Sequence, residues 1–171
     1  MGEKISLGPV LSQDMQTMFS WRNDPEVSYA SGPYIPIDEV VFSEWVSGAK
    51  VQGTRVLFSV RNKHNAKLLG YTELYNIEFS ARSAEFGIAI GLKADRGRGY
   101  GQDATKLALE YCWKELRLER VSLRVVGDNP VAVHVYKKVG FEIEGKLRRA
   151  AFTRGQFHDV TLMGILRPQS V

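Results

Sequence analysis

The feature that most constrains the fold of this chain is a glycine-rich turn, Arg96–Gly101, which reads Arg-Gly-Arg-Gly-Tyr-Gly. The residues before it, Ser83–Gly91, alternate as a β-strand does, and the residues after it, Gln102–Leu116, repeat apolar side chains at helical spacing. A helix N-terminus presents free N–H groups at the positive end of its dipole, so such a turn can hold a phosphate. The alternative is a tight turn with solvated arginines, and the hexapeptide alone does not separate the two.

The patterns on either side predict a single mixed α/β (α+β) domain over residues 1–171. Strands are expected at Lys4–Leu11, Thr54–Val60, Leu68–Ile77, Ser83–Gly91, Val121–Val126, Phe141–Arg149 and Phe157–Leu166. Helices are expected from the cap Ser12 to Trp21, over Ile37–Val46, over Gln102–Leu116, and from the cap Asn129 to Val139. The long helix forms a strand–helix–strand crossover, which places Val121–Val126 beside Ser83–Gly91.

Charge and composition narrow the classes of partner. The formal charge of +4 is spread along the chain, which favours small anionic ligands and predicts no nucleic-acid partner. The single cysteine, Cys112, lies on the apolar stripe of the long helix and is expected to be a buried hydrophobe. No signal core or membrane span is apparent, so a cytoplasmic protein without membrane contact is expected. No His/Cys/Asp spacing resembles a metal site, and no metal is expected.

The strand before the turn has one bulky and one bare face. Phe86, Ile88 and Ile90 point to one side, whereas the side of Glu85 also carries Gly87, Ala89 and Gly91. A bare face leaves room for a ligand along the backbone, and close packing against a helix is the alternative explanation.

A second segment, Asn129–Phe141 (NPVAVHVYKKVGF), follows the turn about thirty residues later. Together, Arg96-x-x-Gly99-x-Gly101 and the Asn, Ala, Tyr and Gly-Phe of this segment resemble the two signatures of the GCN5-related N-acetyltransferases (GNAT). Trp21-Arg22-Asn23-Asp24-Pro25 and Gly145-Lys146-Leu147 are similar to the branch that holds ribosomal-protein N-terminal acetyltransferases and spermidine acetyltransferases. The resemblance implies a mostly antiparallel central sheet of about six to seven strands flanked by about four helices.

The resemblance also implies acetyl-CoA as cosubstrate and assigns its contacts. Backbone N–H groups of Arg96, Gly97, Arg98, Gly99, Tyr100 and Gly101 would hold the pyrophosphate, with added charge from the two arginines. The backbone of Ile88, Ala89 and Ile90 would pair with the pantetheine arm. Asn129 would contact the cosubstrate, Tyr136 would lie near its sulfur, and a homodimer is compatible with this branch.

Acetyl transfer to an amine requires a neutral amine and protonation of the departing thiolate. Tyr136 is the candidate acid, since an oriented phenol can donate to a poorly solvated thiolate. Glu85 and Glu73 are the candidate bases, acting directly or through water, and the sequence does not choose between them. Each of the three has a structural alternative, as a packed tyrosine or a solvated strand-face glutamate.

The function expected is therefore acetyl transfer from acetyl-CoA to a primary amine by direct attack in a ternary complex. A protein N-terminus, a polyamine and another small amine remain open as acceptors, because the segment from Trp21 to Trp45 that would face the acceptor carries no clear signal. Its aromatic residues Trp21, Tyr29, Tyr34 and Trp45 could stack on a substrate or pack between helix and sheet. The alternatives are a non-catalytic acyl-CoA-binding sensor or scaffold and, less favoured, a nucleotide-phosphate binder.

Overall fold

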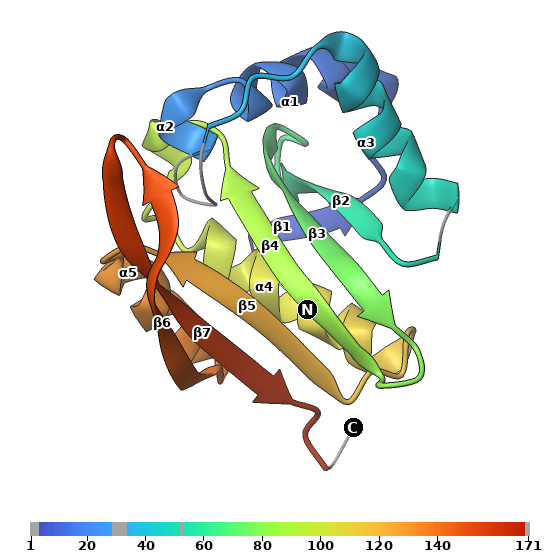
Figure 1. Ribbon diagram of the computed structural model, residues 1–171. Helices are drawn as coiled ribbons and strands as arrows, with labels where there is room; N and C mark the ends of the chain where they lie inside the picture. Colours follow the sequence, from blue (N-terminus) through green and yellow to red (C-terminus); the bar gives the residue numbers. More distant parts are fainter. Residues whose placement is uncertain (1–3, 29–33, 52, 170–171) are drawn as a thin grey trace.

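The fold is built on one seven-stranded sheet with strand order β1-β2-β3-β4-β5-β7-β6. A computed structural model describes residues 4–28, 34–51 and 53–169 (Figure 1). The strands are β1 Ile5–Gly8, β2 Val56–Asn62, β3 Leu68–Glu78, β4 Ser83–Ile90, β5 Arg120–Val126, β6 Glu142–Thr153 and β7 Gln156–Leu166. The helices are α1 Met15–Arg22, α2 Pro25–Ser28, α3 Glu39–Val51, α4 Tyr100–Lys114 and α5 Pro130–Val139, with 3₁₀ turns η1 Ser12–Asp14 and η2 Lys93–Asp95.

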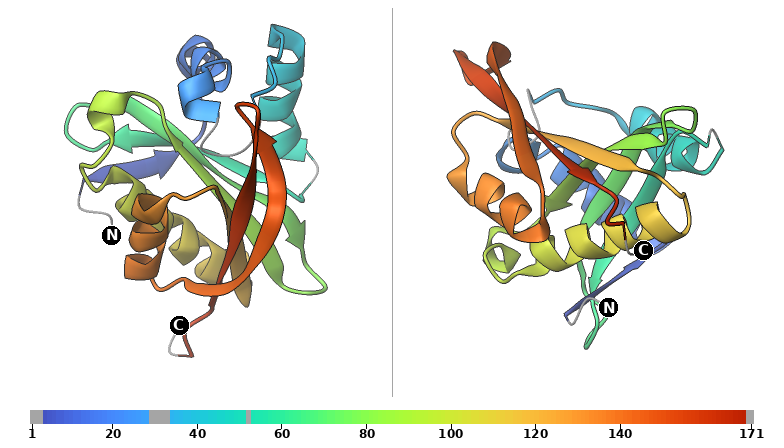
Figure 2. Two further views of the ribbon diagram at one scale, coloured as in Figure 1. Left: turned by 60° about the vertical axis from the view of Figure 1, so that its left-hand side comes forward. Right: turned by 90° about the horizontal axis from the view of Figure 1, so that it is seen from below.

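Helices cover both faces of the sheet (Figures 1 and 2). On one face, α4 buries Ala108, Leu109 and Cys112 against Leu74 of β3 and Phe86 of β4. On the other face, α1 and α3 pack over the same two strands through the cluster Met18, Trp21, Phe42, Val46, Tyr71 and Ala89. Leu74 and Tyr71 lie three residues apart on β3, so they point to opposite faces, and the strand is covered on both sides.

Strands β4 and β5 are parallel neighbours for only three residue pairs, from Ser83↔Arg120 to Glu85↔Ser122. Beyond this point β4 remains paired with β3 as far as Ile90, and β5 remains paired with β7 as far as Val126. The two strands therefore diverge in the middle of the sheet, which Figure 1 shows as an opening between them. The edge of β4 that faces β5 is consequently free of strand partners from Phe86 onward.

The predicted elements are mostly confirmed, including the crossover that brings β5 beside β4. The start of α5 is confirmed in detail, since Asn129 Oδ1 accepts a hydrogen bond from the Ala132 N–H at 3.0 Å. The cap expected at Ser12 is wrong. Ser12 begins the 3₁₀ turn η1, and the carboxylate of the buried Asp14 accepts from the Leu11 N–H at 2.8 Å. Asp14 is also paired with Arg61, which fixes this connection to β2.

Two helical predictions differ from the structure in extent. The chain was expected to leave helix at Asn23-Asp24-Pro25, and α1 does end at Arg22, but α2 begins directly at Pro25. Proline is favoured in a first helical turn because its missing N–H has no partner to lose there, and this accounts for a fifth helix. Helix α3 runs to Val51, several residues beyond the expected end.

Cys112 is fully buried, as expected for an apolar-stripe cysteine, and burial raises the pKa of its thiol to about 12. Within the described ranges, no helix has the length and apolarity needed to cross a bilayer.

The substitution Gly91→Ala is expected to destabilise the fold, because a Cβ on Gly91 would lie 2.0 Å from Cε2 of the Trp21 indole. Overpacking of this kind typically costs about 1–3 kcal/mol. Gly48 in α3 is the matched control, since a Cβ there meets nothing within 4 Å. Gly48→Ala should stabilise by about 0.5–1 kcal/mol, as expected for a helix interior. Urea unfolding of both variants measures the difference, and equal effects would contradict the assigned packing of α1 on β4.

Candidate active site

A groove of about 340 Å³ runs along the free edge of β4 between the start of α4 and α5. Its lining includes Ile88, Ala89 and Ile90 of β4, Arg96, Gly101 and Thr105 around the start of α4, and Asn129, Ala132, Val135 and Tyr136 of α5 and its cap. The two sequence signatures, distant along the chain, thus form the two walls of one groove. The backbone of Ile88–Ile90 is available on this side, since β4 has already separated from β5.

The glycine turn ends at the N-terminus of α4. Gly97 and Gly99 have left-handed φ values of 75° and 85°, and Gly99 precedes the first helical residue, Tyr100. The Asp103 N–H donates to the Gly99 carbonyl at 3.1 Å, so the N–H groups that precede it in the helix have no intrahelical acceptor. The space around Gly97 and Gly101 is open. This geometry suits an anion with several oxygen atoms.

Side chains around the turn are partly committed to the fold. Arg96 donates through Nε and Nη2 to the carbonyls of Ile90 and Gly91, at 3.2 and 3.1 Å, so its guanidinium holds the end of β4. The ring of Tyr100 packs beside the cluster under β1 and β3. Arg98 is exposed, and its carbonyl accepts from Lys4 Nζ at 3.2 Å. Lys4 is a cation at the turn that sequence reasoning missed, because it lies 94 residues away along the chain.

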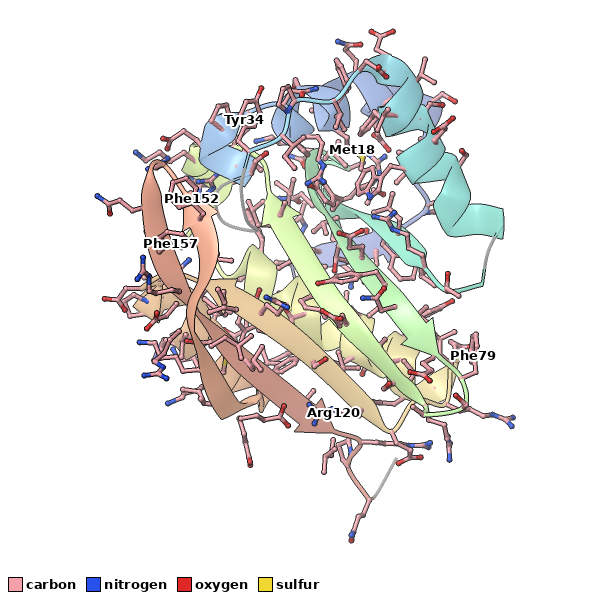
Figure 3. All side chains as sticks on the ribbon, viewed as in Figure 1. Met18, Tyr34, Phe79, Arg120, Phe152 and Phe157 are labelled. Carbon is pink, nitrogen blue, oxygen red and sulfur yellow. The ribbon has the colours of Figure 1, made fainter. Side chains whose placement is uncertain are left out.

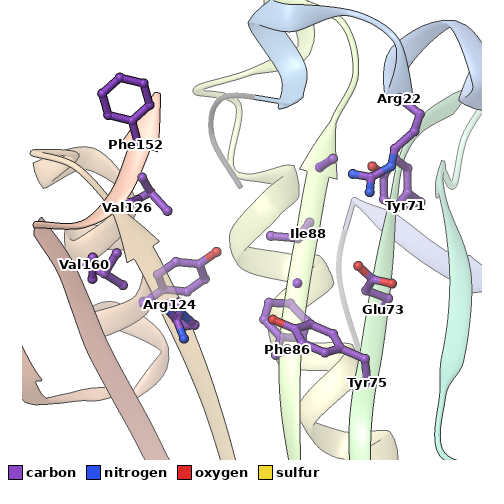
Figure 4. A pocket seen from close by; sticks show the side chains of 15 residues that line it. Arg22, Tyr71, Glu73, Tyr75, Phe86, Ile88, Arg124, Val126, Phe152 and Val160 are labelled. Atoms are coloured by element: carbon purple, nitrogen blue, oxygen red, sulfur yellow. The ribbon is translucent and has the colours of Figure 1, made fainter. Parts of the chain in front are cut away.

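A larger cavity of about 520 Å³ opens on the other side of the same strand (Figure 4). It is lined by Arg22 of α1, by Tyr71, Glu73 and Tyr75 of β3, by Phe86–Ala89 of β4, by Arg124 and Val126 of β5, by Tyr136, and by Ala150, Ala151, Phe152 and Val160 of β6 and β7. Ile88, Ala89 and Tyr136 line both this cavity and the groove. The two spaces therefore meet at Tyr136.

Tyr136 is held by aromatic contacts. Its ring packs edge-on against Phe86, with centroids 6.4 Å apart, and against Phe141, with centroids 5.7 Å apart. Burial raises the pKa of Tyr136 to about 12, so the phenol keeps its proton throughout the physiological range. A fixed, protonated hydroxyl at the junction of two spaces can act as a proton donor.

Glu73 lies in the larger cavity, and its carboxylate is paired with Arg55 of the segment that leads into β2. Burial raises the pKa of Glu73, while the charges of Arg55 and Arg22 oppose this rise. A Cβ on Gly87 of β4 would lie 3.5 Å from Glu73 Oε1, so the glycine leaves the space beside this carboxylate open. Glu73 is thus placed to accept a proton inside the cavity.

Glu85, the other candidate base, is held differently. It accepts a hydrogen bond from Asn76 Nδ2 at 2.9 Å. Its residue pair Tyr75↔Glu85 lies within the stretch where β4 and β5 are still joined. Burial, followed by the charge of Glu85, raises the pKa of Tyr75 to about 12. Of the two glutamates, Glu73 shares the cavity with Tyr136, and Glu85 does not line it.

The bare face of β4 has two different explanations along its length. At Gly91 the expectation of room for a ligand is wrong, because the indole of Trp21 fills that space. At Gly87 the face opens into the cavity beside Glu73. Trp45, another of the four aromatic residues considered for stacking, also packs internally, with its ring centroid 5.3 Å from that of Tyr71. Tyr29 lies outside the described residues.

Sequence reasoning did not assign Arg22, Arg124 or Phe152 to the site, although all three line the cavity. Arg22 belongs to the Trp21–Pro25 segment that carried the branch resemblance, and this was the available signal. Arg124 and Phe152 lie in ordinary strand patterns. Only the pairing of β5, β7 and β6 brings them to the cavity.

The groove fits the cosubstrate that the resemblance implies. A free strand edge can pair with an amide-containing arm, and the glycine turn offers open N–H groups for a pyrophosphate. Within the part of the chain that the structure describes, no three His, Cys, Asp or Glu side chains gather as metal ligands would.

Comparison with known proteins agrees with this geometry. Residues 4–142 match the model of an acetyltransferase (GNAT) domain. A spermidine N(1)-acetyltransferase from Vibrio cholerae is 39% identical over 169 residues, which cover 98% of this chain and 95% of the relative. An L-amino acid N-acetyltransferase from Escherichia coli, AaaT, is 38% identical over 80 residues, 47% of this chain and 49% of the relative.

A solved structure of spermidine N-acetyltransferase from Vibrio cholerae, in complex with CoA and spermine, superposes with a TM-score of 0.86 at 29% identity over 95% of each chain. The predicted family, fold class and N-acetyltransferase activity are thereby confirmed. Because the family model spans both the glycine turn and the Asn129–Phe141 segment, the chain belongs to the GNAT acetyltransferase family.

Proposed function

We propose that this protein transfers the acetyl group of acetyl-CoA to a primary amine, with Tyr136 as general acid and Glu73 as proton acceptor. Tyr136 carries this proposal, since it is the polar side chain shared by the cosubstrate groove and the larger cavity. In this arrangement the thioester arrives along β4 and the amine arrives through the larger cavity, which we call the acceptor cavity. The two reactants meet beside the phenol.

Acetyl-CoA supplies an activated acyl group and a thiolate as leaving group. The backbone of Ile88–Ile90 orients it, the glycine turn binds its phosphates, and the Asn129 side chain contributes its Nδ2 amide, because Oδ1 is used by the helix cap. Holding both reactants in one site converts a bimolecular encounter into a positioned attack.

Two titrating side chains, Glu73 and Tyr136, account for the proton transfers. As the amine nitrogen bonds to the acyl carbon and the carbon–sulfur bond breaks, the amine loses one proton and the sulfur gains one. Glu73 accepts the first proton, directly or through water, since its raised pKa brings its basicity closer to that of an amine. Tyr136 donates the second proton from a hydroxyl that is protonated at neutral pH.

The acceptor is a primary amine, and the relatives name two classes of it. The Vibrio cholerae relative is named for spermidine and the Escherichia coli relative for L-amino acids. A small amine is therefore one option, and a protein N-terminus or side chain is another. An assay with a panel of amines, with free thiol as readout, identifies the acceptor. The alternative of a non-catalytic acyl-CoA sensor would release no thiol. The homodimer and the cytoplasmic location stay predictions.

Tyr136→Phe should lower kcat by at least about 100-fold, because it removes the proton donor while keeping the ring. CoA affinity, measured by calorimetry, should be preserved. Tyr111→Phe is the matched control, since Tyr111 of α4 packs against Phe58 of β2 and lines neither the groove nor the acceptor cavity. If both variants release thiol at the wild-type rate, Tyr136 is not the acid.

The pH profile should show an acidic limb and no basic limb in the ordinary range. Glu73 must be ionised to accept a proton, so kcat/KM falls as pH decreases through its raised pKa. Tyr136 must be protonated to donate, and with its pKa at about 12 activity should not decline below about pH 11. The acceptor amine in this measurement should have a pKa below the pH range in which Glu73 titrates, so that its own ionisation does not contribute to the acidic limb. Glu73→Gln should abolish the acidic limb and lower kcat/KM, and an unchanged limb would assign it to another group.

A further inference from the structure

The acceptor cavity carries more positive than negative charge on its walls. Arg22 and Arg124 line it together with a single carboxylate, that of Glu73. The charge of Glu73 is already matched by its ion pair with Arg55. From this balance we infer that the acceptor amine carries a carboxylate, as amino acids and short peptides do, and that Arg124 binds that carboxylate. The inference rests on the proposed function and specifies its substrate class.

Arg124 is an uncommitted cation. It lies on β5 opposite Leu162 of β7, it is exposed, and it makes no hydrogen bond or ion pair with any residue in the described part of the chain. Its neighbours on the cavity wall, Val126 and Val160, are apolar (Figure 4). A guanidinium with free donors is geometrically suited to a carboxylate, which it can bind through two parallel hydrogen bonds.

Arg22 adds a second, oriented cation on the opposite wall. Its guanidinium lies 5.8 Å from the centroid of the Trp45 ring, and its charge opposes the rise that burial causes in the pKa of the Tyr71 hydroxyl. Figure 4 shows Arg22 directed toward Tyr71 and Glu73, across the cavity from Arg124. A guanidinium has five N–H donors, so these contacts leave others for a ligand. Any acceptor in the cavity is therefore exposed to positive charge from both sides.

This charge distribution discriminates between the acceptor classes. A polyamine brings several ammonium groups, and each would face Arg22 and Arg124 with one arginine-paired carboxylate as compensation. An amino acid or peptide brings one carboxylate for the arginines and one amine for Glu73. The α-amine of a peptide, with a pKa near ~8, is also roughly a tenth neutral at pH 7, whereas a polyamine-like amine near ~10.4 is less than a thousandth neutral. The charge of the walls thus favours amino acids and peptides over polyamines, and amine basicity adds to this preference for peptides.

The apolar part of the cavity suits a small side chain on such an acceptor. Phe152, which is 53% exposed, lies near the tip of the β6–β7 hairpin beside Phe157 (Figure 3), with ring centroids 4.9 Å apart. Ala150, Ala151 and Val160 line the cavity below it. These apolar residues lie on Arg124's side of the cavity, where they can pack against the uncharged part of an acceptor whose carboxylate binds Arg124.

The test compares kcat/KM for a dipeptide, the same dipeptide as its C-terminal amide, a free amino acid and spermidine, with free thiol as readout. The dipeptide and its amide have α-amines of nearly equal basicity and differ in the carboxylate. The dipeptide or the amino acid should exceed the amide and spermidine by at least about tenfold, because charge-assisted hydrogen bonds are stronger than neutral ones. The ratio between the amino acid and the dipeptide identifies the acceptor's length.

Arg124→Gln should reduce kcat/KM for the dipeptide to the level of its amide, mainly through KM. Arg124→Glu should reverse the preference toward spermidine. Lys114→Gln is the control for net charge, because this residue lies in the last turn of α4 and is 59% exposed, and the carboxylate preference should persist in it.

The outcomes distinguish a wrong substrate class from a wrong reaction. A wild-type preference for spermidine, or an equal loss for dipeptide and amide in Arg124→Gln, would overturn the inference and leave acetyl transfer to amines intact. Absence of thiol release with every amine, while CoA still binds, would overturn the proposed function and the inference with it.

Discussion

The site depends on the separation of β4 from β5 after three residue pairs. A parallel pair that continued would bury the edge of β4 and close the space between the strands. Tyr136 packs its ring against Phe86, the first residue of β4 beyond the last pair, and so occupies the point of divergence. The same divergence leaves the free strand edge proposed for the cosubstrate on one side and the cavity proposed for the acceptor on the other. One interruption of the ladder thus creates both binding spaces and places the proposed acid between them.

Electrostatics then distinguishes the two spaces. The groove ends at the N-terminus of α4, where unpaired N–H groups, Lys4 and Arg98 favour phosphate. The acceptor cavity instead combines a partly buried carboxylate with arginines on both walls. Burial shifts the pKa of Glu73 and of Tyr136 upward, which makes one a better base and keeps the other protonated. The proposed proton-transfer roles therefore rest on burial of Glu73 in the acceptor cavity and of Tyr136 at its junction with the groove.

Local sequence patterns predicted most elements, because capping, glycine and proline preferences act over a few residues. Asn129, Pro130 and Gly140 define α5 as expected, with Gly140 in the left-handed region at φ 111°. The failures have tertiary causes. Ser12 lies inside a 3₁₀ turn that is anchored to β2 by the pair between Asp14 and Arg61, and the bare face at Gly91 is filled by the Trp21 ring of α1. Neither partner is near in sequence, so no local pattern could have revealed the contact.

By itself, the sequence determined the strand–turn–helix unit, the second signature and, through them, the family and the class of reaction. Its glycines and helix start leave N–H groups free wherever this unit folds, since these groups belong to the local backbone. Strand register and the divergence of β4 and β5 determine that Glu73, and not Glu85, shares a cavity with Tyr136. The positive walls of that cavity likewise arise from α1 and β5, which are joined only in the folded chain. A site made of backbone N–H groups can be predicted from local sequence, whereas a site made of side chains that face each other across a cavity requires the tertiary structure.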